Sequence, residues 1–383
     1  MNQGAYGCLY HPGMECSGKT MDDLRYATKL VVQDEVSDNE VAVGNIVKGI
    51  LNYGVNFVPV IDTCVVNLGK VQRNNPHALH KCDIVSDATD KGKKDKQSQP
   101  QSKKTKFMLM KMPYIDSLYF YEYIMTMGGN KKKIISCIFD TYSYLIESIE
   151  RLVEHELVHY DLKLQNILMN LKTDTPIIID FGLSIPINHL DKGDAFWDTY
   201  FYRYSPEYYV WPLEAHVINF LQNEADSLSR DDVTSICETF VNANVALNIF
   251  SKGFRARYLK ACIEHYEPWI GVARNTVCEA LLKGWATWDN YALSIAYLQN
   301  LEFISSKHGF TNNHLIIKYV ELLLSNVHPD PARRKTVGDT KRAFTDLFFM
   351  NKKVETYDNI VENFNVDMLV QTTSSMSRDS LRP

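Results

Sequence analysis

Long apolar runs, an excess of basic residues and a secretory leader are all missing from this sequence. No run of about 18 apolar residues occurs, so no transmembrane helix is expected. The net charge is −5, which gives no global positive field for nucleic acid. The first residues lack the basic and apolar regions of a secretory signal. We therefore expect a soluble, intracellular protein with neither a nucleic acid nor a membrane partner.

Closely paired cysteines are also missing. The eight cysteines are scattered, and none forms a CxxC pair. This pattern favours reduced thiols in an intracellular protein. The apolar share of 45 % and the 22 tyrosines predict a sizeable core, and 383 residues suffice for one large two-lobed domain or two ordinary ones.

The most informative stretch lies near the middle of the chain. The letters HYDLKLQNIL at 159–168 are followed by an apolar run and by the triplet DFG that begins at Asp180. Asp161 can accept a proton from an attacking hydroxyl, while Asn166 and Asp180 offer the hard oxygen ligands that Mg²⁺ prefers. The stretch closely resembles the catalytic loop H-R-D-L-x-x-x-N and the DFG motif of protein kinases.

Glycines near the start of the chain fit a phosphate-binding loop. In the letters GAYGCLY, Gly4 and Gly7 are three residues apart and Leu9 follows. Glycines let backbone N–H groups approach phosphates because no Cβ obstructs them. The pattern resembles the end of the kinase loop G-x-G-x-x-G-x-V, with Asn2 in place of the first glycine. No strand is expected before this loop, because Met1 falls inside the motif.

A second glycine motif overlaps this region. The letters GMECSGKT at 13–20 fit the P-loop pattern G-x-x-x-x-G-K-[ST] of a different nucleotide-binding fold. That loop requires a buried strand before it and a helix that begins at its lysine. Residues 10–12 make a poor buried strand, and residues 26–32 predict a strand where the helix should be. We interpret this match as coincidental.

The predicted strand at 26–32 contains the letters YATK, which resemble the V-A-I-K strand of protein kinases. The resemblance implies that Ala27 lies beside ATP and that Lys29 contacts its α and β phosphates. The alternative for Lys29 is an exposed strand lysine. Helical spacing predicts a helix over 34–51. The resemblance implies that Glu40 of this helix pairs with Lys29, and Glu35 is the alternative.

Two more strands, separated by a polar stretch, complete the predicted N-terminal region. A strand is predicted at 57–66 and another at 107–112. The residues around 76–106 cannot bury enough apolar surface to order themselves, so they predict a disordered insertion. The resemblance implies that Met112 lies behind the nucleotide. It also implies that Pro113 and Tyr114 form the hinge against which adenine packs.

Three further motifs follow in the order of the kinase family. The letters SPE that end at Glu207 resemble A-P-E, and DNYALS from Asp289 resembles D-x-W-S-x-G. The letters DPARRKT at 330–336 resemble D-P-x-x-R-x-T. The resemblance implies that Arg334 forms a buried ion pair with Glu207.

Helical periodicity dominates the second half of the chain. It predicts helices at 118–127, 132–154, 213–223, 229–245, 254–266, 314–326 and 340–350. Roughly 70 residues more than the family pattern requires lie between Glu207 and Asp289. We interpret about 213–285 as a helical insertion, which is either a platform for a substrate or partner or a set of helices that thickens the lobe.

The resemblance covers roughly residues 1–350 and implies an α+β, two-lobed protein kinase fold. The small β-rich N-lobe would comprise 1–112, the large α-helical C-lobe 113–350, and a C-terminal tail 351–383, whose end at 370–383 is expected to be disordered. The implied activity is transfer of the ATP γ-phosphoryl group to protein hydroxyls, with ATP and Mg²⁺ as cofactors.

The resemblance also assigns the chemical roles. Asp161 would act as base and Lys163 would stabilise the transferring charge, while Asn166 and Asp180 would hold Mg²⁺. A lysine at 163 is the pattern of Ser/Thr kinases. The alternatives are a pseudokinase that binds nucleotide with little catalysis, or a small-molecule kinase on the same fold.

One departure from the family concerns regulation. Tyr160 stands where the H-R-D arginine would pair with a phosphate on the activation segment. We therefore expect activity that does not depend on segment phosphorylation. The letters GAYGCLYHPGMEC, HYD and WPLE further resemble kinases of large DNA viruses. That resemblance implies a monomeric protein of the host cytoplasm or the virion.

Overall fold

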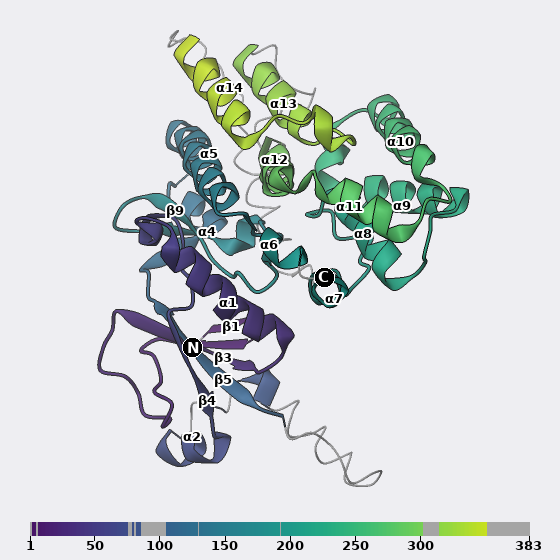
Figure 1. Cartoon of the computed structure of the whole chain (residues 1–383). Coiled ribbons are helices and arrows are strands. Elements are labelled where there is room, and N and C mark those ends of the chain that lie inside the picture. The colour runs from purple at the N-terminus through teal and green to yellow at the C-terminus, as the bar shows by residue number, and fades with distance from the viewer. Residues whose placement is uncertain are drawn as a thin grey trace. The chain divides into compact units, whose positions relative to one another are not determined.

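The chain is described by a computed structural model, and its residues form two compact units. The described residues are 2–4, 7–75, 79, 82–85, 105–128, 130–191, 193–301 and 314–350. As far as they are described, the first unit comprises Met1–Ser117 and Ile177–Ser184, and the second Leu118–Pro176 and Ile185–Pro383. A small antiparallel sheet region and a larger helical part give the α+β class (Figure 1).

An antiparallel five-stranded sheet forms the frame of the first unit. Its strand order is β1-β2-β3-β5-β4. The strands are β1 (Asn2–Gly4), β2 (Gly7–Tyr10), β3 (Tyr26–Val32), β4 (Asp62–Val66) and β5 (Phe107–Pro113). The strand predicted at 26–32 is confirmed, and β5 matches the predicted strand to within one residue.

One prediction about strands is wrong. The strand predicted at 57–66 begins only at Asp62. Before it, Phe57 makes an isolated parallel bridge with Ile178, and Pro59 cannot donate to a sheet ladder because it has no N–H. The short strand β1 lies within the glycine motif, includes Gly4 and is hydrogen-bonded to β2.

The alternation of side chains along the central strands produces two apolar faces. Phe107 and Leu109 of β5 belong to one buried cluster, whereas Met108 and Met110 belong to another. Successive side chains of a strand point to opposite faces, which explains this division. The uninterrupted apolar run of β5 therefore reflects burial on both sides.

Helix α1 (Glu35–Gly49) packs against the face that carries Met108. Its N-terminus is closed by a capping box in which the Asp34 side chain accepts from the Ser37 N–H. Val41 packs against the apolar cluster of that face. Gly44 permits close approach, since a Cβ there would lie 2.5 Å from the Val60 carbonyl oxygen. The helix predicted over 34–51 is thus confirmed with slightly shorter bounds.

Two disulfides cross-link the opposite side of the first unit. Cys8 pairs with Cys82 and Cys16 with Cys64, with Cα–Cα distances of 5.8 and 6.0 Å. The expectation of reduced thiols is therefore wrong for four of the eight cysteines. The partners are 74 and 48 residues apart in the sequence, so local spacing gave no signal of these pairs. The remaining four cysteines are buried thiols.

The P-loop-like segment at 13–20 is a turn that packs on this cross-linked side. Met14 and Thr20 form an antiparallel bridge, and no helix begins at Lys19 in this described segment. Gly18 lies against helix α2 (Leu68–Asn74), where a Cβ would be 2.5 Å from the Val71 Cα. The local structure lacks the helix that a P-loop requires, which agrees with the coincidental interpretation.

Most of the second unit is helical. Its larger helices are α5 (Lys131–Glu154), α8 (Leu213–Asn223), α9 (Arg230–Ala243), α10 (Lys252–Tyr266), α11 (Arg274–Leu282), α12 (Trp288–Leu301), α13 (His314–Asn326) and α14 (Val337–Met350). Helix α5 packs on α12 and α14, and α13 packs on the same two helices (Figure 1). Helices α8 and α11 pack together, as do α9 and α10.

Short elements connect these helices. They are β6 (Ser117–Tyr119), α4 (Phe120–Met125), β7 (Leu157–Val158), β8 (Ile167–Asn170), β9 (Thr175–Ile178), β10 (Ile185–Pro186), α6 (Ile187–Leu190) and α7 (Asp194–Tyr200). Strand β7 pairs with β10, and β6, β8 and β9 form a three-stranded sheet.

The predicted helices agree with the structure to different degrees. Those at 213–223 and 314–326 are confirmed residue for residue. The helix predicted at 118–127 is shorter, because residues 117–119 form β6, and the last helix begins at Val337. The helical character predicted for about 213–285 is confirmed by α8 to α11.

Most of the predicted insertion at 76–106 lies outside the described residues, but the prediction of disorder is wrong for its described part, because Leu79, Cys82 and Val85 are buried in a core cluster. The predicted tail at 351–383 lies wholly outside the described residues. Among the helices that are described, none has both the length and the apolar character of a membrane span.

Breaking the cross-links should weaken the first unit. A disulfide stabilises a fold by restricting the unfolded chain, so we expect Cys16→Ser with Cys64→Ser to lower the free energy of unfolding by about 2–4 kcal/mol. Chemical denaturation with and without reductant measures the loss. The double variant Cys237→Ser with Cys278→Ser is the control, because it leaves both disulfides intact. Counting four reactive thiols in the denatured, unreduced protein would support the pairing, and eight would contradict it.

Candidate functional site

A buried group of charged side chains lies in the first unit. The Nζ of Lys29, on β3, lies 2.9 Å from Oε2 and 3.2 Å from Oε1 of Glu40, on α1. The same Nζ lies 3.2 Å from Oδ1 of Asp180, which is 151 residues away in the sequence. The predicted pairing of Lys29 with Glu40 is present, and the alternative partner, Glu35, is exposed.

Burial and charge act in opposite directions within this group. Burial opposes the charged form of Lys29, but the carboxylates of Asp180 and Glu40 outweigh burial and raise the Lys29 pKa above its usual value. Burial raises the pKa of Glu40, although Lys29 acts against that shift. Lys29 therefore remains a cation.

The DFG segment is fixed to the first unit by contacts that the sequence did not indicate. The Asn39 side-chain amide, on α1, donates to the carbonyls of Gly182 at 3.0 Å and Ser184 at 2.9 Å. Phe181 is buried and packs edge-on against Phe57 at 6.0 Å between ring centroids. Asp180 has a left-handed backbone with φ of 67°, an uncommon conformation that is concentrated at functional sites.

The predicted glycine loop forms a hairpin. Gly4 lies opposite Gly7 in the β1–β2 register, and Leu9 lies opposite Lys29 in the β2–β3 register. A Cβ at Gly7 would lie 2.7 Å from the Leu30 carbonyl oxygen, so glycine is required for the strands to approach. Gly7 is therefore required for packing within the hairpin. Contact of the Gly4 and Gly7 loop with phosphate remains a prediction.

The residues predicted to surround adenine lie at the end of the same sheet. Ala27 is buried opposite Met112, and Tyr26 is opposite Pro113. The Tyr114 N–H donates to the Arg25 carbonyl at 2.8 Å, so pairing continues one residue beyond β5. The ring of Tyr114 is 39 % exposed and stacks on that of His11. Their contact with a nucleotide remains a prediction.

A second polar group lies in the second unit, in the loop after β7. The Lys163 Nζ lies 3.1 Å from the Asp161 Oδ1. The Asn166 side-chain N–H₂ donates to the Asp161 Oδ2 at 2.8 Å and to its carbonyl at 2.9 Å. Because the amide nitrogen faces Asp161, the amide oxygen is the Asn166 atom that remains to contact a cation.

A buried carboxylate anchors this loop through its backbone. Asp289, at the start of α12, accepts from the His159 N–H at 2.7 Å and from the Tyr160 N–H at 3.0 Å. Burial raises the pKa of Asp289, and the contacts with His159 and Tyr160 partly offset this shift. The structural role predicted for Asp289 is thus to fix two consecutive peptide groups with one carboxylate.

Tyr160 is held by aromatic contacts and hydrogen bonds. Its ring is 4 % exposed and stacks on that of Trp211, with centroids 4.7 Å apart. The Trp211 indole N–H donates to the Tyr160 carbonyl at 2.8 Å, and the Asn219 amide donates to the Tyr160 hydroxyl at 2.9 Å. Tyr160 has a φ of 65°, a conformation that costs a bulky residue roughly 1–3 kcal/mol and persists only where the surroundings enforce it.

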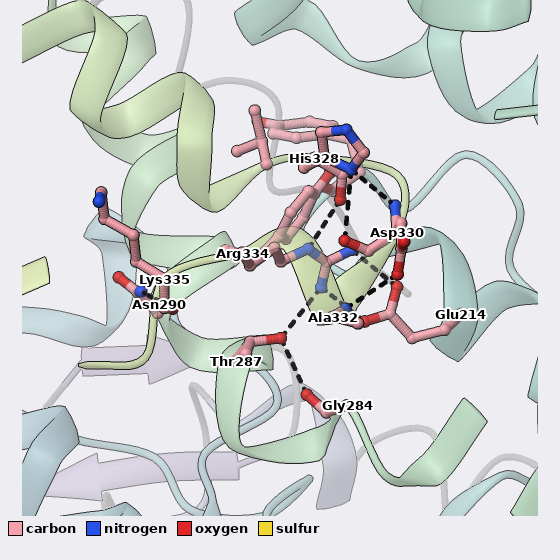
Figure 2. A network of polar contacts seen from close by, with 12 residues as sticks. Glu214, Gly284, Thr287, Asn290, His328, Asp330, Ala332, Arg334 and Lys335 are labelled. Carbon is pink, nitrogen blue, oxygen red and sulfur yellow. Dashed lines mark hydrogen bonds and ion pairs between the residues drawn. The ribbon is translucent and has the colours of Figure 1, made fainter. Parts of the chain in front are cut away.

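The buried ion pair of Arg334 has a different partner from the predicted one. Arg334 Nη1 lies 2.5 Å from Oε1 of Glu214 and Nη2 lies 2.8 Å from Oε2, with both side chains almost fully buried (Figure 2). Arg334 also donates to the His328 carbonyl at 2.8 Å and to the Thr287 hydroxyl at 3.2 Å. The predicted partner, Glu207, is wrong, because that residue is exposed.

The sequence did contain a signal for Glu214. Glu207 follows the polar letters SP in an irregular segment, whereas Glu214 follows Val210-Trp211-Pro212-Leu213, all of which are buried. A carboxylate within such an apolar run requires a cationic partner, since burial of an unpaired charge is costly. Arg334 supplies that charge, and Glu214 outweighs the effect of burial and raises the Arg334 pKa.

The described residues contain no cluster of three or more His, Cys, Asp or Glu side chains with the geometry of a metal site. Mg²⁺ at a phosphate-transfer site does not require one, because it is held by one or two protein oxygens together with substrate phosphates and water. The side chain of Asp180 is 34 % exposed and therefore accessible to a cation. The partly exposed carboxylate of Asp180 therefore fits the role of one protein oxygen ligand to Mg²⁺.

Comparison with known proteins adds no assignment. No family model matches the chain, and a search of curated proteins finds no match.

Glu214, the observed partner of Arg334, and Glu207, the predicted one, provide a matched test. Removing one partner of a buried ion pair leaves an uncompensated charge, so Glu214→Ala should lower the free energy of unfolding by about 3–5 kcal/mol. Glu207→Ala should change it by no more than about 0.5 kcal/mol, as expected of a surface position. Urea denaturation measures both variants. Equal losses, or a larger loss for Glu207→Ala, would contradict the pairing.

Proposed function

We propose that the chain is a Ser/Thr protein kinase that transfers the γ-phosphoryl group of ATP to protein hydroxyls. The observation that carries the proposal is the buried ion group of Lys29, Glu40 and Asp180, which combines three residues from separate motifs. A structural ion pair would need only two charges. A lysine that contacts two carboxylates, one of them partly exposed, is instead suited to a polyphosphate with its metal ion.

The proposal divides the roles between the two units. In the first, Lys29 contacts the ATP phosphates, Glu40 orients Lys29, and Asp180 supplies an oxygen to Mg²⁺. In the second, Asp161 accepts the proton of the acceptor hydroxyl and Lys163 offsets the negative charge of the phosphoryl group. Bound Mg²⁺ would neutralise phosphate charge, and Asn166 would contribute its amide oxygen.

The architecture of each unit supports a two-lobed kinase fold. The first unit has a five-stranded antiparallel sheet with one long helix, α1, packed on a face of it. The second unit is helical and carries the loop with Asp161 directly after α5 and β7. A lysine in the sheet and a glutamate in the helix, joined by an ion pair, are the arrangement that phosphate binding in this fold requires.

Loss of the proposed base should abolish transfer without loss of nucleotide binding. Asp161→Asn removes the proton acceptor and should reduce the rate by about 10²–10⁴-fold, because general base catalysis has that magnitude. Transfer of radiolabelled phosphate from ATP measures activity, and fluorescence titration measures nucleotide binding. Asp226→Asn is the control, since the Asp226 side chain is 93 % exposed. Equal and near-zero transfer by wild type and Asp161→Asn, with nucleotide still bound, would favour a pseudokinase.

Activity should not require phosphorylation of the segment after DFG. Trp211, Asn219 and Asp289 hold the loop at Tyr160 without any phosphate, so no ionic switch is needed there. We expect phosphatase-treated protein, verified by mass spectrometry, to retain its transfer activity. A loss of activity that phosphorylation at 183–204 restores would contradict the prediction.

A further inference from the structure

The hydroxyl of Tyr208 makes contacts with two proposed catalytic side chains. Tyr208 Oη donates a hydrogen bond to Oδ1 of Asp161. It also accepts one from the Lys163 Nζ at 3.2 Å, while that Nζ lies 3.1 Å from the same Asp161 oxygen. The three polar atoms therefore form a closed cycle. No sequence motif assigned a role to Tyr208, because this residue lies just beyond the SPE letters.

The Tyr208 ring is fixed as firmly as its hydroxyl. Tyr208 is 3 % exposed and packs edge-on against Trp211, with centroids 5.1 Å apart. Trp211 in turn donates its indole N–H to the Tyr160 carbonyl. The segment from 208 to 211 thus contacts the catalytic loop at two points, once through a hydroxyl and once through an indole.

We propose that Tyr208 is a positioning residue that fixes the Asp161 carboxylate and the Lys163 ammonium in one geometry. The inference rests on the proposed kinase function, because it concerns how that reaction's base is held. A hydroxyl can hold both groups since it donates to the carboxylate and accepts from the ammonium. Lys163 has three donors, of which these contacts use two, and its side chain is 19 % exposed. The remaining donor is available to a phosphoryl oxygen.

The contrary interpretation is that the Tyr208 hydroxyl occupies the place of the substrate hydroxyl and blocks it. In that case the Tyr208 hydroxyl would have to move away from Asp161 in every catalytic cycle. Withdrawal of the buried ring would expose its apolar surface to water, and loss of the hydrogen bond to a charged group would add to that cost. A carboxylate oxygen can accept more than one hydrogen bond, so the contact leaves Asp161 able to receive an acceptor hydroxyl.

Two adjacent tyrosines allow a matched test. Tyr208→Phe keeps the ring and removes only the hydroxyl that contacts Asp161 and Lys163. Tyr209→Phe is the control, because that hydroxyl accepts from Gln299 at 3.0 Å and contacts neither residue. We expect kcat of Tyr208→Phe to fall about 10- to 100-fold, which is the usual cost of a misplaced catalytic group. KM for ATP and for peptide should stay unchanged, and Tyr209→Phe should behave as wild type.

Faster turnover by Tyr208→Phe would show a block and overturn the proposal, and an unchanged kcat would show a purely structural tyrosine. If Tyr208→Phe does not fold, Tyr208→His is the second variant. Its ring nitrogens can donate and accept, so kcat should remain above that of the Asp161→Asn enzyme, and a kcat no higher would overturn the proposal.

A second measurement does not depend on activity. Reductive methylation with formaldehyde and cyanoborohydride, followed by peptide mass spectrometry, reports the reactivity of the Lys163 amine. We expect Lys163 to be modified faster in Tyr208→Phe than in wild type or Tyr209→Phe. An unchanged rate would overturn the positioning role. If wild type transfers no more phosphate than Asp161→Asn, the proposed function fails, and the Lys163 reactivity still decides whether Tyr208 holds the pair.

Discussion

The second unit depends on one buried carboxylate. Asp289 accepts hydrogen bonds from two consecutive backbone N–H groups and thereby sets the course of the chain into Asp161. Those N–H groups would otherwise be buried without partners, a costly arrangement for any peptide group. The left-handed backbone of Tyr160 is tolerated because this anchor and the Trp211 stack enforce it together.

The Tyr160 side chain is held by contacts that do not titrate near neutral pH. At position 160 this chain has a buried tyrosine packed on a tryptophan. Burial raises the pKa of the Tyr160 hydroxyl, and its bond with Asn219 only partly offsets the shift. The contact therefore stays neutral throughout the physiological range and insensitive to salt, unlike a surface ion pair.

Local patterns allowed much of the fold to be predicted, and tertiary pairing explains most errors. Strand β3 and helices α8 and α13 were predicted residue for residue, since their periodicity and bounding residues lie within the segment itself. The pairing of Lys29 with Glu40 was predicted from the resemblance of YATK and the helix after it to protein kinase motifs, and the structure contains this pair. Glu214 was missed because the resemblance of SPE to A-P-E assigned the pair to Glu207, although the apolar run before Glu214 indicated burial of that carboxylate. The contacts of Tyr208 and Asn39 left no sequence signal, because neither residue belongs to a recognisable motif.

The two disulfides give the first unit a particular covalent connectivity. The link from Cys16 to Cys64 is nested within the link from Cys8 to Cys82, so one ring of chain encloses β3, α1 and α2. Strand β5 lies outside both rings although it pairs with β3 on one side and β4 on the other. A single cut of the backbone between 17 and 63 would leave both pieces covalently joined. The middle of the sheet, by contrast, is closed by hydrogen bonds and apolar packing alone.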